Sequence, residues 1–181
     1  MDPFFAYKIA HQGLKKEKHR FEFRLDDKFF GNFEHTQITD ADILATMTLD
    51  TTHEPYVVDI EIEGQTNGDC DKCAATIPLK VRGDFKLFVK FTESAIPEDE
   101  TDDIDIIYLT RDEPEIDFTQ YLYEFAHLSL PVIKTCEKPF ATSYCDMEVG
   151  RIMQQLHTEE TNNDDIDPRW SALNKLKDKK G

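Results

Sequence analysis

The feature that most constrains this chain is the alternation that dominates three successive runs of residues. Apolar side chains occupy every second position within residues 43–49 and 56–62, and the same series runs through residues 77–91 with one break at Gly83. Successive side chains of a β-strand point to opposite faces, so this period of two predicts long strands that bury one face. Compositions typical of turns separate the runs at residues 51–55 and 64–68. The pattern therefore predicts a meander of antiparallel strands.

Shorter strands are expected on both sides of the meander. Residues 7–30 have an extended pattern, in which a strand at 7–10 and a second strand with apolar residues at alternate positions form an opening hairpin. Residues 93–117 carry eleven acidic residues and one basic residue, and a short strand is expected at 104–109 within this stretch. We interpret the acidic stretch as a solvated loop or a surface that faces a basic partner.

One central helix is expected after the acidic stretch. Asp117 is placed as its N-cap, with Gln120 three residues further on, and Pro131 ends it. The apolar residues that recur at helical spacing are Phe118, Leu122, Phe125, Ala126 and Leu128.

The elements together predict an α+β fold, mainly an antiparallel β-sheet or open barrel with one central helix and a C-terminal tail helix. We expect a mainly β domain at residues 1–157, followed by an acidic linker and an amphipathic basic tail helix at 158–181. Trp170, Leu173 and Leu176 share one face of that tail helix. This face either packs back onto the domain or binds a groove of a partner.

Composition excludes several classes of protein. The chain has 181 residues, with 21 Lys and Arg against 37 Asp and Glu, and its formal net charge is −16. No run approaches the ~18 apolar residues of a membrane helix. The first residues also lack the basic and apolar regions of a signal peptide, so a cytoplasmic protein is expected. A net charge of −16 repels nucleic acid unless a local basic patch overcomes it.

Four cysteines form the strongest candidate site. Cys70 and Cys73 make a CxxC motif within an expected turn, and this spacing lets two thiolates converge on one tetrahedral metal ion. Cys136 and Cys145 follow the helix with eight residues between them. Four cysteines are the number that a structural zinc site made only of thiolates needs. His127 is a substitute ligand, although a lone histidine on such a helix is more often part of the core or surface.

Other interpretations of the cysteines stay open at this point. The thiols are free and buried, or the second pair is unrelated to the first. A redox-active CxxC is a third alternative, but it is expected at the N-terminus of a helix near a βαβ unit, whereas this one lies within a strand meander.

Catalytic motifs are not found. The acidic run does not hold two carboxyl groups at a defined separation, and we see no glycine-rich phosphate loop, serine nucleophile elbow or HExxH motif. Basic residues gather at two places, either to contact RNA phosphates locally or to keep the chain soluble. They are Lys15, Lys16, Lys18 and Arg20 near the start, and Lys175 and Lys177 in the tail.

The order of these landmarks resembles that of the YceD family, whose members are called large ribosomal RNA subunit accumulation proteins. They are the CxxC at 70–73, an acidic segment that opens a helix, Leu130-Pro131, Cys136, and a closing Asp-Pro-x-x-x-x-Leu-x-x-Leu-Lys at 167–177. The resemblance covers roughly residues 56–181. It implies a bacterial or organellar, non-enzymatic factor that is needed for large-subunit rRNA to accumulate.

We therefore expect a ribosome-biogenesis factor that acts as an adaptor or scaffold, with a structural zinc site. Because the chain is acidic, its expected partner is a ribosomal protein or an rRNA-processing factor, bound by the acidic loop or the tail helix. The alternative is a zinc-stapled RNA-binding module that contacts large-subunit rRNA through its basic clusters. Neither a membrane nor a small-molecule substrate is expected. A thiol oxidoreductase is the third function considered, after the adaptor and the RNA-binding module.

Overall fold

The computed structural model describes residues 3–34, 36–93, 105–136, 148, 149, 151, 152 and 155. Contacts within the chain divide it into two units. Unit 1 comprises Met1–Asp69 and Thr76–Lys134, and unit 2 comprises Cys70–Ala75 and Thr135–Gly181. The boundary expected between residues 157 and 158 lies outside the described residues and stays a prediction, as does the tail helix.

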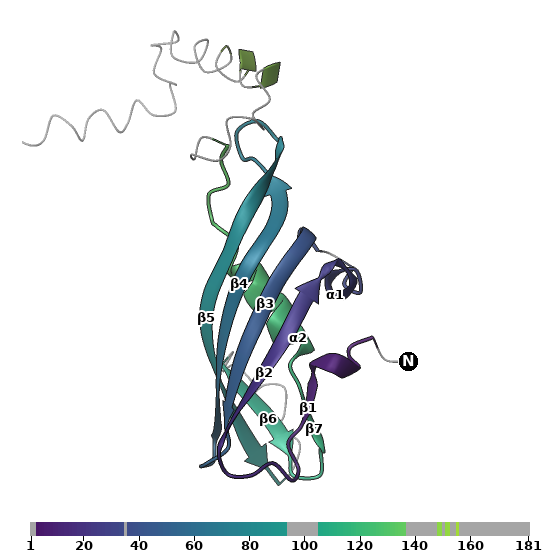
Figure 1. Ribbon diagram of the computed structural model, residues 1–181, viewed down its shortest axis with the longest axis vertical. Coiled ribbons are helices and arrows are strands. Elements are labelled where there is room, and N and C mark those ends of the chain that lie inside the picture. Colours follow the sequence, from purple (N-terminus) through teal and green to yellow (C-terminus); the bar gives the residue numbers. More distant parts are fainter. Residues whose placement is uncertain are drawn as a thin grey trace, which may run out of the picture. The chain divides into compact units, whose positions relative to one another are not determined.

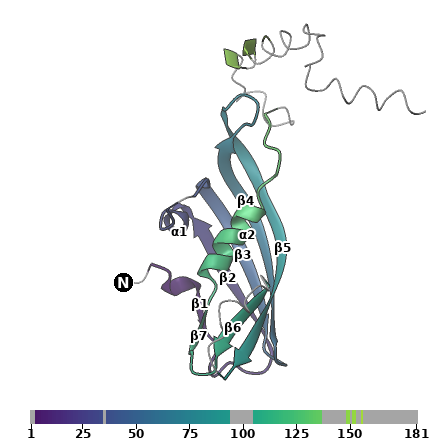
Figure 2. The same ribbon diagram turned by 180° about the vertical axis from the view of Figure 1, so that it is seen from behind.

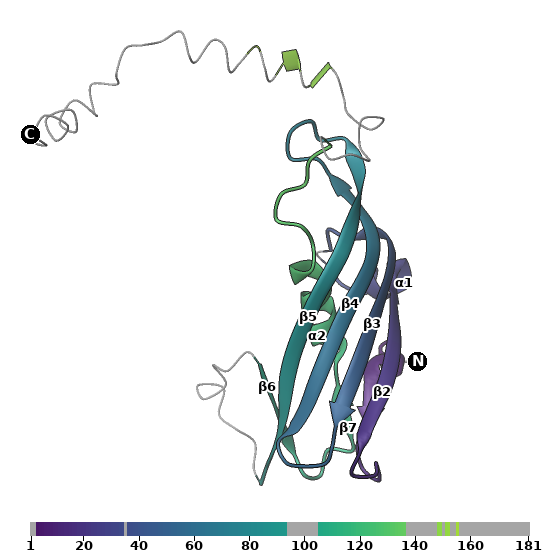
Figure 3. The same ribbon diagram turned by 60° about the vertical axis from the view of Figure 1, so that its left-hand side comes forward.

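Unit 1 is built on a five-stranded sheet. The strands are β2 (Lys18–Asp26), β3 (Thr39–Asp50), β4 (Tyr56–Asp69), β5 (Thr76–Thr92) and β6 (Ile106–Thr110). They lie in the order β2-β3-β4-β5-β6, as Figure 1 and Figure 3 show. Every neighbouring pair is antiparallel except β5 and β6, which run parallel. The sheet is thus mainly antiparallel and open, and the predicted α+β class is confirmed.

The alternation in the sequence becomes a buried inner face and a solvated outer face. On β3, for example, Ile43, Ala45, Met47 and Leu49 are all at most 1% exposed, while the residues between them point to the other side. Helix α2 (Thr119–Leu128) lies across the inner face, which Figure 2 shows from behind. Burial of these side chains against the helix removes apolar surface from water, and this is the main stabilising contribution of the core.

Aromatic stacking helps to fix helix α2 on the sheet. The rings of Phe85 on β5 and Phe125 on α2 lie parallel, with centroids 4.1 Å apart. Leu122 and Ala126 are fully buried on the same side of the helix. Leu128, which we placed with them, is 71% exposed. That assignment is wrong because two residues of an α-helix span about 200°, which puts Leu128 opposite Ala126.

The predicted opening hairpin is also wrong. Strand β1 (Lys8–Ala10) pairs antiparallel with β7 (Glu115–Asp117), and β2 pairs along its whole length with β3. Ile9 and Ile116 meet in the β1–β7 pair and are both buried, and Lys8 forms a 3.5 Å ion pair with Asp117. The two strands of this pair are more than a hundred residues apart in the sequence. Their pairing is therefore decided by the burial of Ile9 and Ile116 and by the ion pair, and not by nearness in the sequence.

Two local structures interrupt the segment expected to be extended. Residues Phe5–Tyr7 form the 3-10 helix η1, and Asp27–Phe30 form the one-turn helix α1. The carboxylate of Asp26 accepts the backbone N–H groups of Lys28 and Phe29, at 3.0 and 3.2 Å, and so begins α1. The turn buries Phe29 and Phe30 in the core, which a continued strand would not do.

Helix α2 begins one residue later than predicted. Its N-cap is Phe118, and the Asp117 carboxylate accepts the N–H of Thr119 at 2.9 Å. Gln120 donates to Glu124 rather than back to the cap, so no capping box forms. The helix ends at Leu128, before Pro131, as expected. No helix among the described residues is long and apolar enough to span a membrane.

Candidate metal centre

The CxxC motif forms a tight turn in unit 2, between the end of β4 and the start of β5 in the chain. Cys70 and Ala75 close the turn, because the N–H of Cys70 donates to the carbonyl of Ala75 at 2.9 Å. The N–H of Ala74 donates to the carbonyl of Cys70 at the same distance. Ala74 has φ +54°, in the left-handed region that most residues with a side chain avoid. The backbone of Ala74 is therefore locally strained in the turn that carries the two cysteines.

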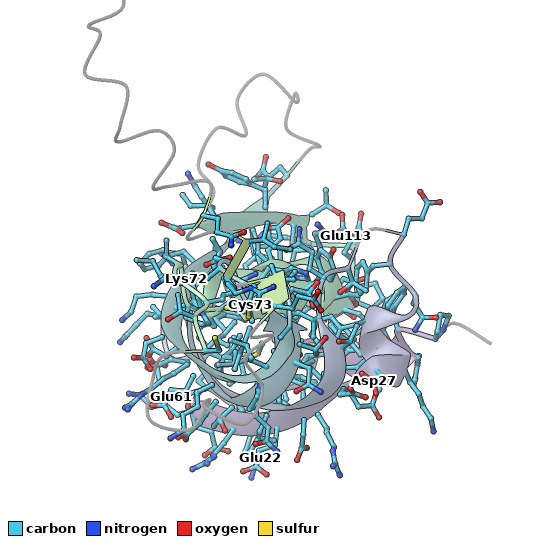
Figure 4. All side chains as sticks on the ribbon, turned by 90° about the horizontal axis from the view of Figure 1, so that it is seen from above. Glu22, Asp27, Glu61, Lys72, Cys73 and Glu113 are labelled. Carbon is cyan, nitrogen blue, oxygen red and sulfur yellow. The ribbon has the colours of Figure 1, made fainter. Side chains whose placement is uncertain are left out.

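Three cysteine sulfurs converge within unit 2. The Sγ atoms of Cys70, Cys73 and Cys136 all lie within 4.8 Å of one another, and all three side chains are buried. Cys73 Sγ and Cys136 Sγ are 3.7 Å apart, and the three cysteines are free thiols. Figure 4 labels Cys73 and its neighbour Lys72 on the turn. The structure thus joins the CxxC to a cysteine 63 residues further along the chain.

Backbone N–H groups surround the sulfur of Cys70. The N–H of Lys72 and the N–H of Cys136 donate to Cys70 Sγ at 3.4 and 3.3 Å. Burial raises the pKa of the Cys70 thiol, but hydrogen bonds from the backbone N–H groups of Lys72, Cys73 and Cys136 outweigh it and lower the pKa from 9.0 to about 7. Hydrogen bonds to the charged form favour that form, so the site is prepared for a thiolate.

The donor set fits a thiophilic metal ion. Zinc binds thiolates at about 2.3 Å, which for a tetrahedral ion places neighbouring sulfurs about 3.8 Å apart. The 3.7 Å between Cys73 Sγ and Cys136 Sγ agrees with that spacing. Several buried thiolates without a cation would be costly, because each buried charge needs a compensating partner. Three buried sulfurs at this spacing are therefore positioned to bind a metal ion.

The structural context disfavours the thioredoxin-like interpretation. The CxxC lies on a turn after a strand, whereas a low-pKa redox CxxC needs the N-terminus of a helix. His127, considered as a substitute ligand, lies on α2, where its Nδ1 is 2.9 Å from the carbonyl oxygen of Tyr123. Its ring packs against Tyr123, with centroids 4.3 Å apart. His127 is thus a partly buried residue of an aromatic cluster, as the more ordinary interpretation held.

Several predicted site residues lie outside the described residues. They are Cys145 of the proposed metal site, Trp170, Leu173 and Leu176 of the proposed partner-binding face, and Lys175 and Lys177 of the tail. The structure reports nothing on these positions, so their roles stay predictions.

The basic cluster near the start of the chain is exposed and partly paired with acids. Lys15 and Lys16 lie on the connection before β2, and Lys18 and Arg20 lie on β2 itself. Lys18 Nζ is 3.8 Å from a carboxylate oxygen of Asp50, and Arg20 is 3.3 Å from one of Glu22. These two partners reduce the positive charge that the cluster can offer to a phosphate chain.

The fold and the site define an α+β protein with a three-cysteine candidate metal centre, in which two cysteines of a turn meet Cys136. The family model described as "Large ribosomal RNA subunit accumulation protein YceD" matches residues 58–177, about two-thirds of the chain. The chain therefore belongs to the YceD family, and that description links the family to the accumulation of large-subunit rRNA. A search of curated proteins and a search of solved structures found no match.

Sequence reasoning missed two features of this region. The positive φ of Ala74 carried no signal, because alanine rather than glycine occupies the position. The donation from the N–H of Cys136 to Cys70 Sγ depends on a backbone position that spacing alone does not give. Both features concern how the turn is shaped, and the sequence indicated only that its sulfurs were candidates.

Proposed function

We propose that this protein is a non-enzymatic factor of ribosome biogenesis that supports the accumulation of large-subunit (23S-type) rRNA. Membership of the YceD family, over residues 58–177, is the observation that carries this proposal. The family is described by an effect on rRNA and not by a reaction. Since such rRNA is assembled into ribosomes in the bacterial cytoplasm, the protein is proposed to act there.

We further propose that it acts as an adaptor or scaffold for another protein, and not mainly by binding rRNA directly along its own surface. The net charge of −16 opposes a broad contact with a phosphate polymer. The same charge favours a basic protein, such as a ribosomal protein, or an rRNA-processing factor. The acidic stretch within residues 93–117 and the tail face of Trp170, Leu173 and Leu176 are the proposed contacts.

A sucrose gradient of cell lysate tests the adaptor proposal. The protein is followed through the gradient with and without RNase at matched salt. The adaptor proposal expects a complex that survives RNase. A triple variant Trp170→Ala, Leu173→Ala, Leu176→Ala should no longer sediment with this complex, because it lacks the proposed partner-binding face. Release by RNase supports direct RNA binding instead. A protein that stays at the top of the gradient in both lanes contradicts stable association of either kind.

The metal is proposed to be structural zinc held by Cys70, Cys73 and Cys136, with Cys145 as the fourth ligand. A bound zinc ion would contribute folding free energy directly, because the unfolded chain does not hold the site. The support comes from the buried cluster of three sulfurs within 4.8 Å of one another and from the 3.7 Å between Cys73 Sγ and Cys136 Sγ, which agrees with a tetrahedral ion. The cysteines would supply the thiolate ligands and their burial would shield these from water. The backbone N–H groups of Lys72 and Cys136 donate to Cys70 Sγ and would stabilise its thiolate.

Metal analysis of the purified chain tests this assignment. We expect about one zinc per chain, loss of zinc in Cys70→Ser and Cys136→Ser, and a lower melting temperature in both. Cys145→Ser tests the fourth ligand, and Lys72→Gln, in the same turn but without a sulfur, serves as the control. A Cys70→Ser variant that keeps its metal and melts like the parent would contradict the proposal.

The alternative function is a zinc-stapled module that binds rRNA through Lys15, Lys16, Lys18 and Arg20 together with Lys175 and Lys177. The exposure of the first four residues favours this alternative. The ion pairs of Lys18 and Arg20 count against it. In the gradient it predicts release by RNase and a strong dependence on salt.

A further inference from the structure

The outer face of β5 is unlike the rest of this acidic protein. Its inward positions are apolar, and its outward positions from Lys80 to Lys90 carry four cations and one anion. The outward residues in order are Lys80, Arg82, Asp84, Lys86, Phe88 and Lys90. All the charged ones are exposed. Neighbouring outward side chains of a strand are about 6.6 Å apart, so these residues form one column that is basic at both ends and interrupted by Asp84 and Phe88.

The column lies beside two contrasting strands. On one side, β4 presents the acidic residues Asp59, Glu61 and Glu63 on the same face, opposite Lys86, Asp84 and Arg82 in the strand register. On the other side, β6 presents Tyr108 directly opposite Lys90. Figure 4 shows Glu22 and Glu61 on the outer face, away from the helix that covers the inner one. A ligand with negative charge therefore meets β5 from the β6 side and not from the β4 side.

Two aromatic rings lie among the charged side chains near the C-terminal end of β5. Phe88 lies between Lys86 and Lys90, and Tyr108 lies on β6 with the Lys90 ammonium 5.7 Å from its ring centroid. Both rings are only partly buried, although each sits on the face that carries the charged side chains. Each ring therefore keeps part of its surface open to solvent beside the Lys90 ammonium, where a flat apolar group of a ligand could stack on it.

We propose that this basic and aromatic column, from Lys80 to Lys90 on β5 with Tyr108 on β6, binds single-stranded RNA. Lysines spaced along an extended strand suit successive phosphates, and every base has a flat face that can stack on Phe88 or Tyr108. A folded acidic protein would offer carboxylates but no bases for the rings. This modest contact adds to the proposed adaptor role, in which a protein and not rRNA holds the complex together, and it does not involve the cysteine site.

The acidic neighbours set how strong the contact is. Lys86 forms a 2.9 Å ion pair with Asp59, so part of its charge is already compensated. The field of a chain at −16 also opposes a phosphate polymer at long range. The surface is therefore expected to bind RNA modestly and to lose affinity steeply as salt rises. Removal of the Asp59 carboxylate should strengthen it, which a merely structural role for the lysines does not predict.

The test measures fluorescence anisotropy of a labelled 12-nucleotide uridine oligomer against the full-length protein. Four cations give a slope of log affinity against log salt of about −3, at about −0.7 per contact on a single strand. The double variant Lys86→Gln, Lys90→Gln should reduce that slope by about 1.4. Phe88→Leu and Tyr108→Leu keep apolar bulk but remove a stacking face, and each should weaken binding about tenfold.

Matched variants on β2 and β3, near the opposite edge of the sheet, provide the controls. Lys18→Gln with Arg20→Gln removes the same charge from β2, and should leave binding within twofold. Asp59→Asn should tighten binding several-fold, whereas Asp42→Asn, which frees Arg24 from its 3.0 Å ion pair, should not. Because Asp59→Asn predicts a gain, its result does not depend on whether the other variants fold poorly.

Three outcomes would overturn the proposal. Binding that falls with the β2 variants but not with the β5 variants would move the RNA site to the basic cluster near the start of the chain. Equal competition by a polyglutamate peptide would show a surface for any polyanion, and not for RNA. Unchanged affinity in Phe88→Leu and Tyr108→Leu would show that the rings do not stack on bases.

Discussion

The sheet of unit 1 and the cysteine turn of unit 2 hold their shapes by different means. In unit 1, burial is distributed over many apolar side chains, and residues from β1 to β7 and from both α1 and α2 share one core. In the turn, order depends on three sulfurs within 4.8 Å of one another and on a few backbone hydrogen bonds. The comparison teaches that the sheet should tolerate single losses in proportion to buried area, whereas the turn should fail as a whole.

The largest effect is expected from removal of the proposed zinc ion. A zinc chelator should lower the melting temperature by many degrees and remove the hydrogen-exchange protection of the Cys70 and Ala74 amides, since binding and folding free energy are one quantity here. The measurement is a thermal melt by circular dichroism together with amide exchange. Lys72→Gln with its metal bound is the control. If the chelator leaves both readouts unchanged, the turn is held without a metal ion and the contrast with the sheet disappears.

Truncation of the core comes next. Leu122→Ala should cost about 2–5 kcal/mol of the free energy of unfolding, because Leu122 is fully buried beneath the sheet and leaves a cavity. Leu128→Ala changes the same residue type on the same helix, but at 71% exposure it should cost less than about 0.5 kcal/mol. Urea denaturation measures both. Equal costs would mean that α2 does not seal the core as described.

Glycine substitutions refine the comparison within the sheet. A Cβ on Gly64 would lie 2.6 Å from the Cα of Ile43, on the backbone of β3, and even closer to the carbonyl oxygen of Asp42. Gly64→Ala should therefore push two strands apart and cost about 1–3 kcal/mol. A Cβ on Gly83 would meet side-chain atoms of Ser129 and Phe85, so relief there displaces side chains and the Ser129 hydrogen bond to Phe125 rather than the backbone of a strand. We expect Gly83→Ala to cost clearly less in the same denaturation experiment, and the reverse order would contradict the β3–β4 register.

The smallest effect concerns pH and the metal-free turn. The pKa of Cys70 is lowered from its ordinary value of 9.0 to about 7 in the folded chain, because the hydrogen bonds outweigh the effect of burial, so the folded state favours the thiolate. The stability that this thiol contributes is present above pH ~9 and is lost as the pH falls through 7. Ultraviolet absorbance of the thiolate, taken as the difference between the chain and Cys70→Ser, should titrate near pH 7. A midpoint near 9 would show that the N–H donors do not act on this sulfur.

Much of the sheet could be predicted from the sequence because the period of two is a local signal. The runs ending at Leu49, Ile62 and Phe91 lie in β3, β4 and β5, with the apolar positions facing inward. The turn expected at residues 64–68 is wrong, because β4 continues through them to Asp69 and pairs there with β5. Errors arose where a short segment had more than one possible partner. Residues 8–10 read as a strand in any case, but only the fold showed that Ile9 meets Ile116 instead of a residue of β2.

For the candidate site, the sequence supplied the chemistry and the fold supplied the geometry. Spacing identified Cys70 and Cys73 as one pair of donors, because two residues between cysteines suit a tight turn. That spacing could not show which later cysteine joins them. The outward lysines of β5 were equally visible in the alternation, but their meaning depends on Tyr108, which reaches them through a parallel pairing that no local pattern encodes.

By itself, the amino-acid sequence determined the main part of β2 to β5 with its buried face, the central helix, the family and the cysteines of the candidate metal site, but not β7 or α1. These follow from periodicity and residue chemistry, which act between near neighbours in the chain. Only the tertiary structure decided that β1 joins β7, that β6 lies parallel to β5 and that Cys136 meets the CxxC turn. Such contacts are selected by burial and hydrogen bonding across long loops, and their free energy depends on every element packed at the same time.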